Sequence, residues 1–247
     1  MKLGFVLPNN WGLDDPLAVV ALGVAAEERG LDSVWVNHHV INVGYIADRL
    51  QDRPYYDALT TLAWVGARTE RIALGTSVLV LPYLHPMVLA KELATIDQLS
   101  GGRVVAGVGV GSLPEENAIL GVGYDDRGAR ADVCLGVMRS LWGQGPSDVE
   151  GAEVDLDAVV AAPKPRQGLL PIWVGGSGAP ARRRAARFGQ GWHPMCSRSG
   201  LARRMPAMVE ALERQGRLRS DLVVAPRIGI DQVPDRAAVE AWAEAGA

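Results

Sequence analysis

Residues 71–111, "RIALGTSVLVLPYLHPMVLAKELATIDQLSGGRVVAGVGVG", contain two apolar runs separated by a segment with helical character. The runs at 72–80 and 104–109 predict buried strands, whereas the segment at 86–99 begins at a proline and stops before two glycines, as helices do. A strand, a helix and a strand in this order form a parallel βα unit. This stretch therefore indicates an α/β protein built on a parallel sheet.

The same alternation recurs on both sides, for example in "AEERGLDSVWV" and "RFGQGWHPM". We expect strands at residues 3–7, 33–37, 72–80, 104–109, 172–174, 191–195 and 222–230, and helices at residues 15–29, 57–67, 86–99, 130–142, 180–188, 201–215 and 235–245. The pattern predicts a (β/α)8 TIM barrel lacking its eighth βα unit, because the sequence stops where earlier copies turn into a strand. We expect one domain over residues 1–247, with an insertion near 143–170 that is rich in Gly, Pro and Asp.

The composition is that of an ordinary globular chain, with 247 residues, 48% hydrophobic residues and a net charge of −3. This balance argues against nucleic acid or a membrane surface as a partner, and no apolar run approaches the ~20 residues of a membrane span. The two cysteines, Cys134 and Cys196, have no metal-type spacing and suit a reducing compartment. We therefore expect a soluble cytoplasmic protein.

A glycine-rich turn follows the apolar run at 172–174 and reads Gly175, Gly176, Ser177, Gly178. Such a turn exposes backbone N–H groups, and Pro180 suits the first turn of a helix, whose dipole favours an anion. The turn therefore predicts a phosphate site. The arginines at 182–184 either support that anion or form a solvated helix face.

Several kinds of active site are not favoured at the expected strand ends. No lysine lies there, which argues against Schiff-base chemistry. His38 and His39 are adjacent, so on a strand they point to opposite faces and cannot share one metal ion. There is no H-E-x-x-H motif and no G-x-S-x-G elbow, and we expect no metal. Glycines, small polar groups and histidines suit a bound cofactor that performs the chemistry itself.

The chain resembles the luciferase-like monooxygenase superfamily, particularly its deazaflavin branch, which uses coenzyme F420. The resemblance lies in "LDSVWVNHHV", the stretch 71–111 quoted above, "GYDDRGARAD", "PKPRQGLLPIWVGGSG" and "ARFGQGWHP", which occur in the family's order. It implies a (β/α)8 barrel that binds coenzyme F420, or alternatively FMN, with the phosphate-bearing tail at the glycine turn.

Carried over to this sequence, the resemblance places His38 and His39 beside the redox ring, with His39 as the proton-transfer residue. It implies a non-proline cis peptide between Ser77 and Val78, against the back of the ring. The other implied cofactor contacts are Val80, Val110, Gly111, Ser112, Glu115, Gly175, Gly176, Ser177, Gly178 and Ala179. Val78 and Val80 equally fit an ordinary buried strand.

Two positions depart from the related sugar-phosphate dehydrogenases, which have an aspartate at His38 and a glutamate at Ser112. Both changes argue against sugar-phosphate oxidation. The first hypothesis is an F420-dependent oxidoreductase acting on a small organic substrate, with His39 or His38 moving the proton. The second is a monooxygenase using reduced FMN and O2, and the third is an inactive or incomplete cofactor-binding barrel. A homodimer is expected from the family.

Overall fold

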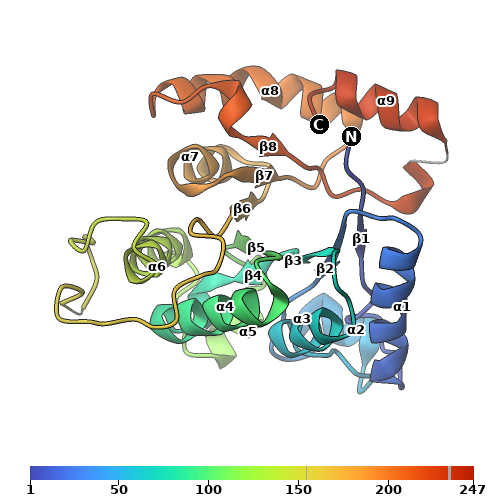
Figure 1. The fold of residues 1–247 in the computed structure, drawn as a ribbon, viewed down its shortest axis with the longest axis horizontal. Coiled ribbons are helices and arrows are strands. Elements are labelled where there is room, and N and C mark those ends of the chain that lie inside the picture. The colour runs from blue at the N-terminus through green and yellow to red at the C-terminus, as the bar shows by residue number, and fades with distance from the viewer. Residues whose placement is uncertain (154, 233–234) are drawn as a thin grey trace. The chain divides into compact units, whose positions relative to one another are not determined.

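The computed structural model describes residues 1–153, 155–232 and 235–247. The chain forms two compact units. Residues 2–170 make up the first, called here the N-terminal unit, and residues 171–247 together with Met1 make up the second, the C-terminal unit. Each combines parallel strands with helices, as Figure 1 shows.

The N-terminal unit contains a parallel sheet in the order β1 (Gly4–Val6), β2 (Ser33–Val36), β3 (Ala73–Thr76) and β5 (Val104–Gly109). A two-residue strand, β4 (Leu79–Val80), also pairs with β5. The sequence predicted all of these positions, but the strand expected at 72–80 is broken into β3 and β4. The break falls at Ser77 and Val78, whose peptide bond is cis, as the family resemblance implies.

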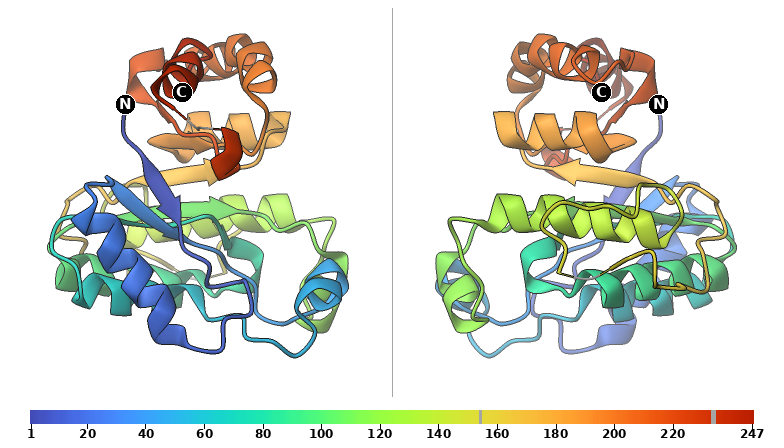
Figure 2. Two further views of the ribbon diagram at one scale, coloured as in Figure 1. Left: turned by 90° about the vertical axis from the view of Figure 1, so that its right-hand side faces the viewer. Right: turned by 90° about the vertical axis from the view of Figure 1, so that its left-hand side faces the viewer.

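Four helices lie on one face of this sheet (Figures 1 and 2). They are α1 (Pro16–Glu28), α3 (Ala58–Ala67), α4 (Pro86–Ser100) and α6 (Arg127–Leu141), and each contacts the next in the row. Their ends follow from the sequence. Asp15 caps α1 by accepting a hydrogen bond from the Leu17 N–H, and Gly101, with φ of +78°, ends α4 in the left-handed conformation.

The indole of Trp35 explains why glycines stand in the neighbouring strands. Trp35 is buried and pairs in register with Gly75 of β3. A Cβ atom on Gly75 would lie 2.2 Å from the Trp35 ring, and one on Gly4 would lie 2.5 Å from Trp35 Nε1. The indole therefore takes the space that side chains on β1 and β3 would need.

Two short helices that the sequence did not predict follow the ends of β2 and β5. They are α2 (Gly44–Leu50) and α5 (Pro114–Ile119). Ile46 and Leu50 of α2 pack against Leu113, the residue before α5, in a small buried cluster. A 3-10 turn, η1 (Leu81–Tyr83), follows β4. Because these segments follow strand ends, they stand where βα proteins carry their functional residues.

The described residues of the expected insertion, 143–170, form neither helix nor strand. The far end of this loop is fastened to the unit by side chains. Gln167 Nε2 donates to Asp97 Oδ1 at 2.7 Å and to the Val104 carbonyl at 2.8 Å, and Lys164 Nζ donates to the Leu141 carbonyl at 2.6 Å. Asp97 is fully buried, so Gln167 fastens the loop to a fixed point of the packed interior.

The C-terminal unit has three parallel strands in the order β6 (Ile172–Gly175), β7 (Gly191–His193) and β8 (Val223–Val224). Its helices are α7 (Ala179–Phe188), α8 (Arg198–Glu213) and α9 (Arg236–Glu244), with a 3-10 turn, η2 (Arg219–Asp221), before β8. The strand expected at 222–230 is wrong in length. Beyond Val224 the chain still pairs with the segment of β7, because the N–H groups of Ala225 and Arg227 donate to the carbonyls of Trp192 and Pro194 at 2.9 and 2.8 Å, but only as an isolated bridge at Arg227 before the 3-10 turn η3 (Ile230–Gln232).

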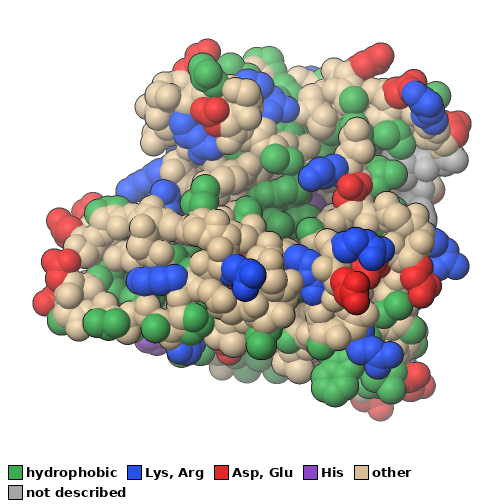
Figure 3. Space-filling model, in the orientation of Figure 1, with side chains coloured by type: hydrophobic (Ala, Val, Ile, Leu, Met, Phe, Trp, Pro, Cys, Tyr) green, Lys and Arg blue, Asp and Glu red, His purple; other side chains and the backbone are tan. Residues whose placement is uncertain are grey.

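The surface carries both signs of charge. Lys and Arg side chains are interspersed with Asp and Glu side chains over the face drawn in Figure 3, as the small net charge leads one to expect. Among the described helices, none is both long and apolar enough to cross a membrane.

Candidate active site

A buried cluster of asparagines fixes the chain where β1 and β2 end. Asn9 Nδ2 donates to the carbonyls of Asn37 and Tyr56, both at 2.9 Å, and its Oδ1 accepts the Asn37 N–H at 2.9 Å. Asn37 Nδ2 donates in turn to Asn10 Oδ1 at 3.1 Å. Since these amides are buried and satisfied by one another, they hold the backbone immediately before His38 in one position.

His38 is buried and has its Nδ1 atom occupied as an acceptor. The backbone N–H of Val80, on β4, donates to His38 Nδ1 at 3.1 Å. Burial lowers the pKa of His38 to about 4, so the ring is neutral at pH 7. A neutral ring that accepts at Nδ1 carries its proton on Nε2, and His38 therefore presents an N–H donor.

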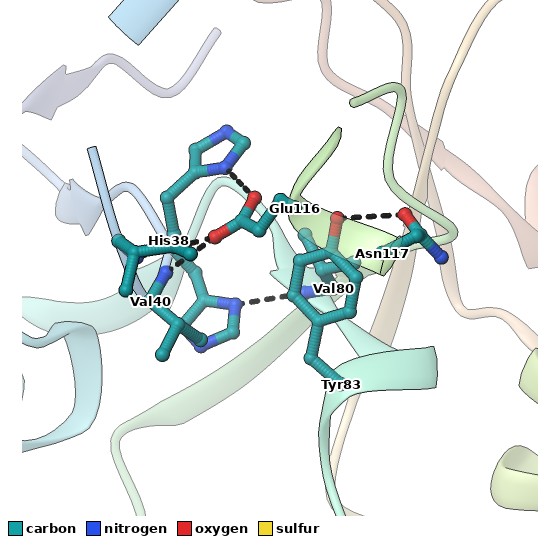
Figure 4. Close-up of polar contacts among 8 residues, drawn as sticks. His38, Val40, Val80, Tyr83, Glu116 and Asn117 are labelled. Carbon is teal, nitrogen blue, oxygen red and sulfur yellow. Dashed lines mark hydrogen bonds and ion pairs between the residues drawn. The ribbon is translucent and has the colours of Figure 1, made fainter. Parts of the chain in front are cut away.

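His39 makes the opposite kind of contact, with the Glu116 carboxylate that is labelled in Figure 4. Its Nδ1 lies 2.5 Å from Glu116 Oε2, and the second oxygen of Glu116 accepts the Val40 N–H at 2.7 Å. Glu116 is fully buried, whereas the His39 side chain is 15% exposed. Burial alone would raise the pKa of Glu116, but the hydrogen bonds from His39 and Val40 outweigh it and hold that pKa below its usual value.

The next residue of α5, Asn117, holds a tyrosine in the same region. Tyr83, at the end of η1, donates its O–H to Asn117 Oδ1 at 2.9 Å. Burial, with the negative charge of Glu116, raises the pKa of Tyr83. Glu116 and Asn117, two consecutive buried residues of α5, thus hold the imidazole of His39 and the neutral phenol of Tyr83 in place.

Aromatic rings border the histidines. Tyr45 and Tyr55 meet the His39 ring edge-on, with centroids 6.4 and 5.8 Å away, and Tyr83 is tilted against His38 at 6.4 Å. These contacts limit how far either imidazole can turn. The His39 side chain is 15% exposed and His38 only 6%, so His39 is the more accessible of the two imidazoles.

Two glycines, at the end of β5 and just beyond it, leave room for the side chains of residues 78–83, the segment that includes β4 and η1. A Cβ atom on Gly109 would lie 2.5 Å from Val78 Cγ2. One on Gly111, whose φ is +78°, would lie 2.8 Å from Val80 Cγ1 and 3.3 Å from the Tyr83 hydroxyl. The glycines of "GVGVG" are therefore required by the packing of the segment that donates to His38.

The structure brings together only some of the residues predicted for the ring site. His38 is hydrogen-bonded to the backbone of Val80 and His39 follows it in the chain, but Ser112 and Glu115 are exposed. The two histidines lie beyond β2, which ends at Val36, rather than on a strand.

The prediction also missed Glu116. Its burial could not be read from a helical period, because α5 has only six residues, and the need of a buried carboxylate for a partner becomes evident only once the structure shows Glu116 buried.

The glycine turn of the C-terminal unit joins β6 to α7 as predicted. Pro180 lies in the first turn of α7, and Gly176 has a φ of +100°. The N–H groups of Gly176, Ser177 and Gly178 have no acceptor among the described residues. Free N–H groups at a helix N-terminus are suited to phosphate oxygens.

The three arginines of α7 behave differently from one another. Arg183 is exposed, as the solvated-face interpretation expects, but Arg184 is buried. Arg182 turns back and donates to the Ser177 carbonyl at 3.0 Å, which Arg204 of α8 also approaches at 3.2 Å. Positive charge therefore lies against the turn.

No group of three or more His, Cys, Asp or Glu side chains placed to hold a metal ion occurs in the described part of the chain. His193, on β7, is engaged differently. Its Nδ1 lies 2.6 Å from the Ala225 carbonyl, and burial lowers its pKa to about 4. This is the pattern of a structural histidine.

Parallel strands alternating with helices, with a histidine–carboxylate pair beyond a strand end, are typical of α/β enzymes, and comparison with known proteins specifies the family. The model of the luciferase-like monooxygenase family matches residues 1–247. The chain therefore belongs to the luciferase-like monooxygenase family.

A curated relative, the F420-dependent glucose-6-phosphate dehydrogenase of Kineococcus radiotolerans, is 33% identical over 249 residues, covering 96% of this chain and 70% of that protein. Among solved structures, the coenzyme F420-dependent tetrahydromethanopterin reductase of Methanopyrus kandleri has a TM-score of 0.72 at 22% identity, over 91% of this chain and 65% of its own. The oxygenating constituent of 3,6-diketocamphane monooxygenase of Pseudomonas putida, in complex with FMN, has a TM-score of 0.68 at 19% identity, over 91% and 66%.

These structures confirm the predicted fold class, a luciferase-like α/β barrel of the (β/α)8 type. The chain spans about two thirds of the length of the proteins it resembles. The three named relatives are all oxidoreductases.

Proposed function

We propose that this protein is an F420-dependent oxidoreductase that transfers a hydride between the deazaflavin ring and a small organic substrate. The observation that carries the proposal is the His39–Glu116 pair, an accessible imidazole held by a buried carboxylate. Hydride transfer to or from an alcohol carbon must be matched by proton transfer at its oxygen, and a positioned histidine is suited to that role.

The choice of F420 over FMN is supported by the relatives. The dehydrogenase of Kineococcus radiotolerans, at 33% identity, is named for its F420 dependence, whereas the structure with FMN is only 19% identical. The chain's own residues fit a phosphate-bearing cofactor, because the N–H groups of the turn at 176–178 have no acceptor within the part of the chain that the structure describes. When bound, the deazaflavin would accept or donate the hydride.

The ring site of the proposal is made of His38, His39 and the segment from Ser77 to Val80 in the N-terminal unit. Val110, Gly111, Ser112 and Glu115 are retained as candidate contacts. For the oxidation of an alcohol, Nε2 of His39 would accept the proton of the alcohol oxygen, while the bound cofactor would supply the hydride acceptor. His38, which is neutral and buried, donates a hydrogen bond and does not change its charge near neutral pH.

The phosphate site of the proposal is the turn formed by Gly175, Gly176, Ser177, Gly178 and Ala179 in the C-terminal unit. Its N–H groups and the start of α7 would bind phosphate oxygens. Arg182 and Arg204, which already lie against the Ser177 carbonyl, would add positive charge nearby.

The test is a fluorescence titration of the purified chain with F420 and with FMN, followed by turnover with F420 and a panel of secondary alcohols, aldehydes and sugar phosphates. We expect F420 to bind more tightly, and His39→Gln to lower kcat/KM by about 10²-fold or more. His85→Gln is the matched control, because His85 is exposed at the start of α4 and its side chain makes no capping bond.

Tighter binding of FMN would instead support the monooxygenase alternative, and binding of neither would support the inactive one. Sugar phosphates are tested separately from the other substrates, because the family resemblance implies two carboxylates in the related dehydrogenases where this chain has His38 and Ser112. We further propose a cytoplasmic homodimer, which sedimentation analysis of the purified chain and fractionation of cells would test.

A further inference from the structure

The two adjacent histidines are held by partners of opposite hydrogen-bonding character. At His38 the partner is a backbone N–H, from Val80, which can only donate. At His39 the partner is an ionised carboxylate, Glu116, which can only accept. Each contact is made through Nδ1, so the partner decides which ring nitrogen carries the proton.

We infer that Glu116 is a positioning residue that holds His39 with its proton on Nδ1, so that Nε2 is a proton acceptor, while Val80 holds His38 in the opposite tautomer as a donor. The inference rests on the proposed function for the direction of proton transfer. It deepens that function by assigning different roles to two residues that the sequence presents as equivalent.

The geometry around Glu116 makes the assignment specific. Oε2 faces His39 Nδ1 at 2.5 Å, and Oε1 faces the N–H groups of Val40 and Ile41 at 2.7 and 3.4 Å. Both carboxylate oxygens are therefore in use. The carboxylate fixes the imidazole and the backbone immediately after it at the same time.

Because both carboxylate oxygens of Glu116 accept hydrogen bonds, the effect of an amide at the same position can be predicted. In Glu116→Gln the side chain keeps only one oxygen. The N–H groups of Val40 and Ile41 can only donate, so we expect that oxygen to face them. The amide NH2 then faces His39 Nδ1. A donor at that point requires Nδ1 to accept, so His39 is expected to change to the Nε2–H tautomer and lose its proton-accepting edge.

Among the described residues, no other ionisable group provides a second acceptor for His39 Nδ1. Tyr45, from α2, and Tyr55 meet the ring edge-on. His38 precedes it in the chain and is engaged with Val80. The tautomer of His39 therefore depends on Glu116.

The experiment is long-range 1H–15N correlation NMR of the full 15N-labelled chain without cofactor, with the His39 signals identified by their loss in His39→Gln. We expect the Nε2–H tautomer for His38, the Nδ1–H tautomer for His39, and a change of His39 to Nε2–H in Glu116→Gln. Glu28→Gln, the same change at an exposed residue of α1, should leave the His39 tautomer as it is.

Finding both histidines of the unaltered chain in the same tautomer would overturn the inference, even if Glu116→Gln does not fold. Retention of Nδ1–H in a folded Glu116→Gln would overturn it as well. In turnover with F420, Glu116→Gln should lose about 10²-fold or more in kcat/KM, since a histidine in the wrong tautomer loses most of its activity in other enzymes. Because the spectra need no cofactor, failure of F420 to bind would refute the proposed function separately.

Discussion

Removing the Glu116 side chain should destabilise the fold because two donors would lose a charged acceptor. The contacts at 2.5 Å to His39 and 2.7 Å to the Val40 N–H are both short, whereas the 3.4 Å contact to Ile41 contributes little. Hydrogen bonds to a charged group contribute about 1.5–3 kcal/mol each. We therefore expect Glu116→Ala to lower the free energy of unfolding by about 3–6 kcal/mol.

A double-mutant cycle separates the histidine contact from the backbone contact. The variants are Glu116→Ala, His39→Ala and the double variant, unfolded in urea and followed by circular dichroism at pH 7. The coupling free energy between the two side chains should be about 1.5–3 kcal/mol, the value of one charged hydrogen bond. Glu28→Ala, at an exposed position of α1, should cost about 0.5 kcal/mol or less and show no coupling to His39.

The coupling should also depend on pH in a known direction. The pKa of Glu116 is lowered in the folded protein, so the stabilisation that its carboxylate provides is present above the unfolded pKa of about 4.3 and is lost as the pH falls through the folded pKa.

A cost below about 1 kcal/mol for Glu116→Ala, or a coupling free energy near zero at pH 7, would refute the reasoning.

Three further predictions concern other parts of the chain. Gly75→Ala should cost about 1–3 kcal/mol in urea unfolding, because the new Cβ would lie 2.2 Å from the Trp35 ring; an unchanged midpoint would contradict this. The pKa values of His38 and His193, about 4 in the fold, lie below the unfolded value of about 6.5, so the unfolded state binds protons first. Stability should fall as pH drops from 6.5 to 4, by about 1.4 kcal/mol per pH unit for each, and urea midpoints at pH 7 and 5 measure it. Gly176→Ala, at φ of +100°, should lower stability by about 1–2 kcal/mol and weaken F420 binding; titration showing full affinity would argue against a phosphate at this turn.

Much of the fold was predictable because burial and helix ends leave periodic marks in the sequence. The parallel strands β1, β2, β3 and β5 consist of apolar residues bounded by turns, and Asp15, Pro16 and Gly101 mark the helix ends directly. Local patterns of this kind depend on residues close in the chain. They are therefore readable without knowledge of the tertiary contacts.

The errors arise where distant contacts decide the local structure. The strand expected at 72–80 is interrupted at Ser77 and Val78, and the apolar residues on both sides of this point, 72–74 and 78–80, suit one continuous strand equally well. The helix α5 is only six residues long, too short for a clear period, so residue 116 carried no evident sign of burial. Its partner, His39, is 77 positions away, and no spacing rule spans that distance.

The anchored loop at 143–170 has a practical consequence for handling the protein. Its far end is held by Gln167 and Lys164, while Val160 is 95% exposed and Asp157 is exposed as well. Additional residues placed between these two positions would be accommodated outside the packed interior. A fluorescent reporter or an affinity tag inserted at 158–159 would leave the anchor and the histidines in place, and offers a means of immobilising the protein without using either terminus.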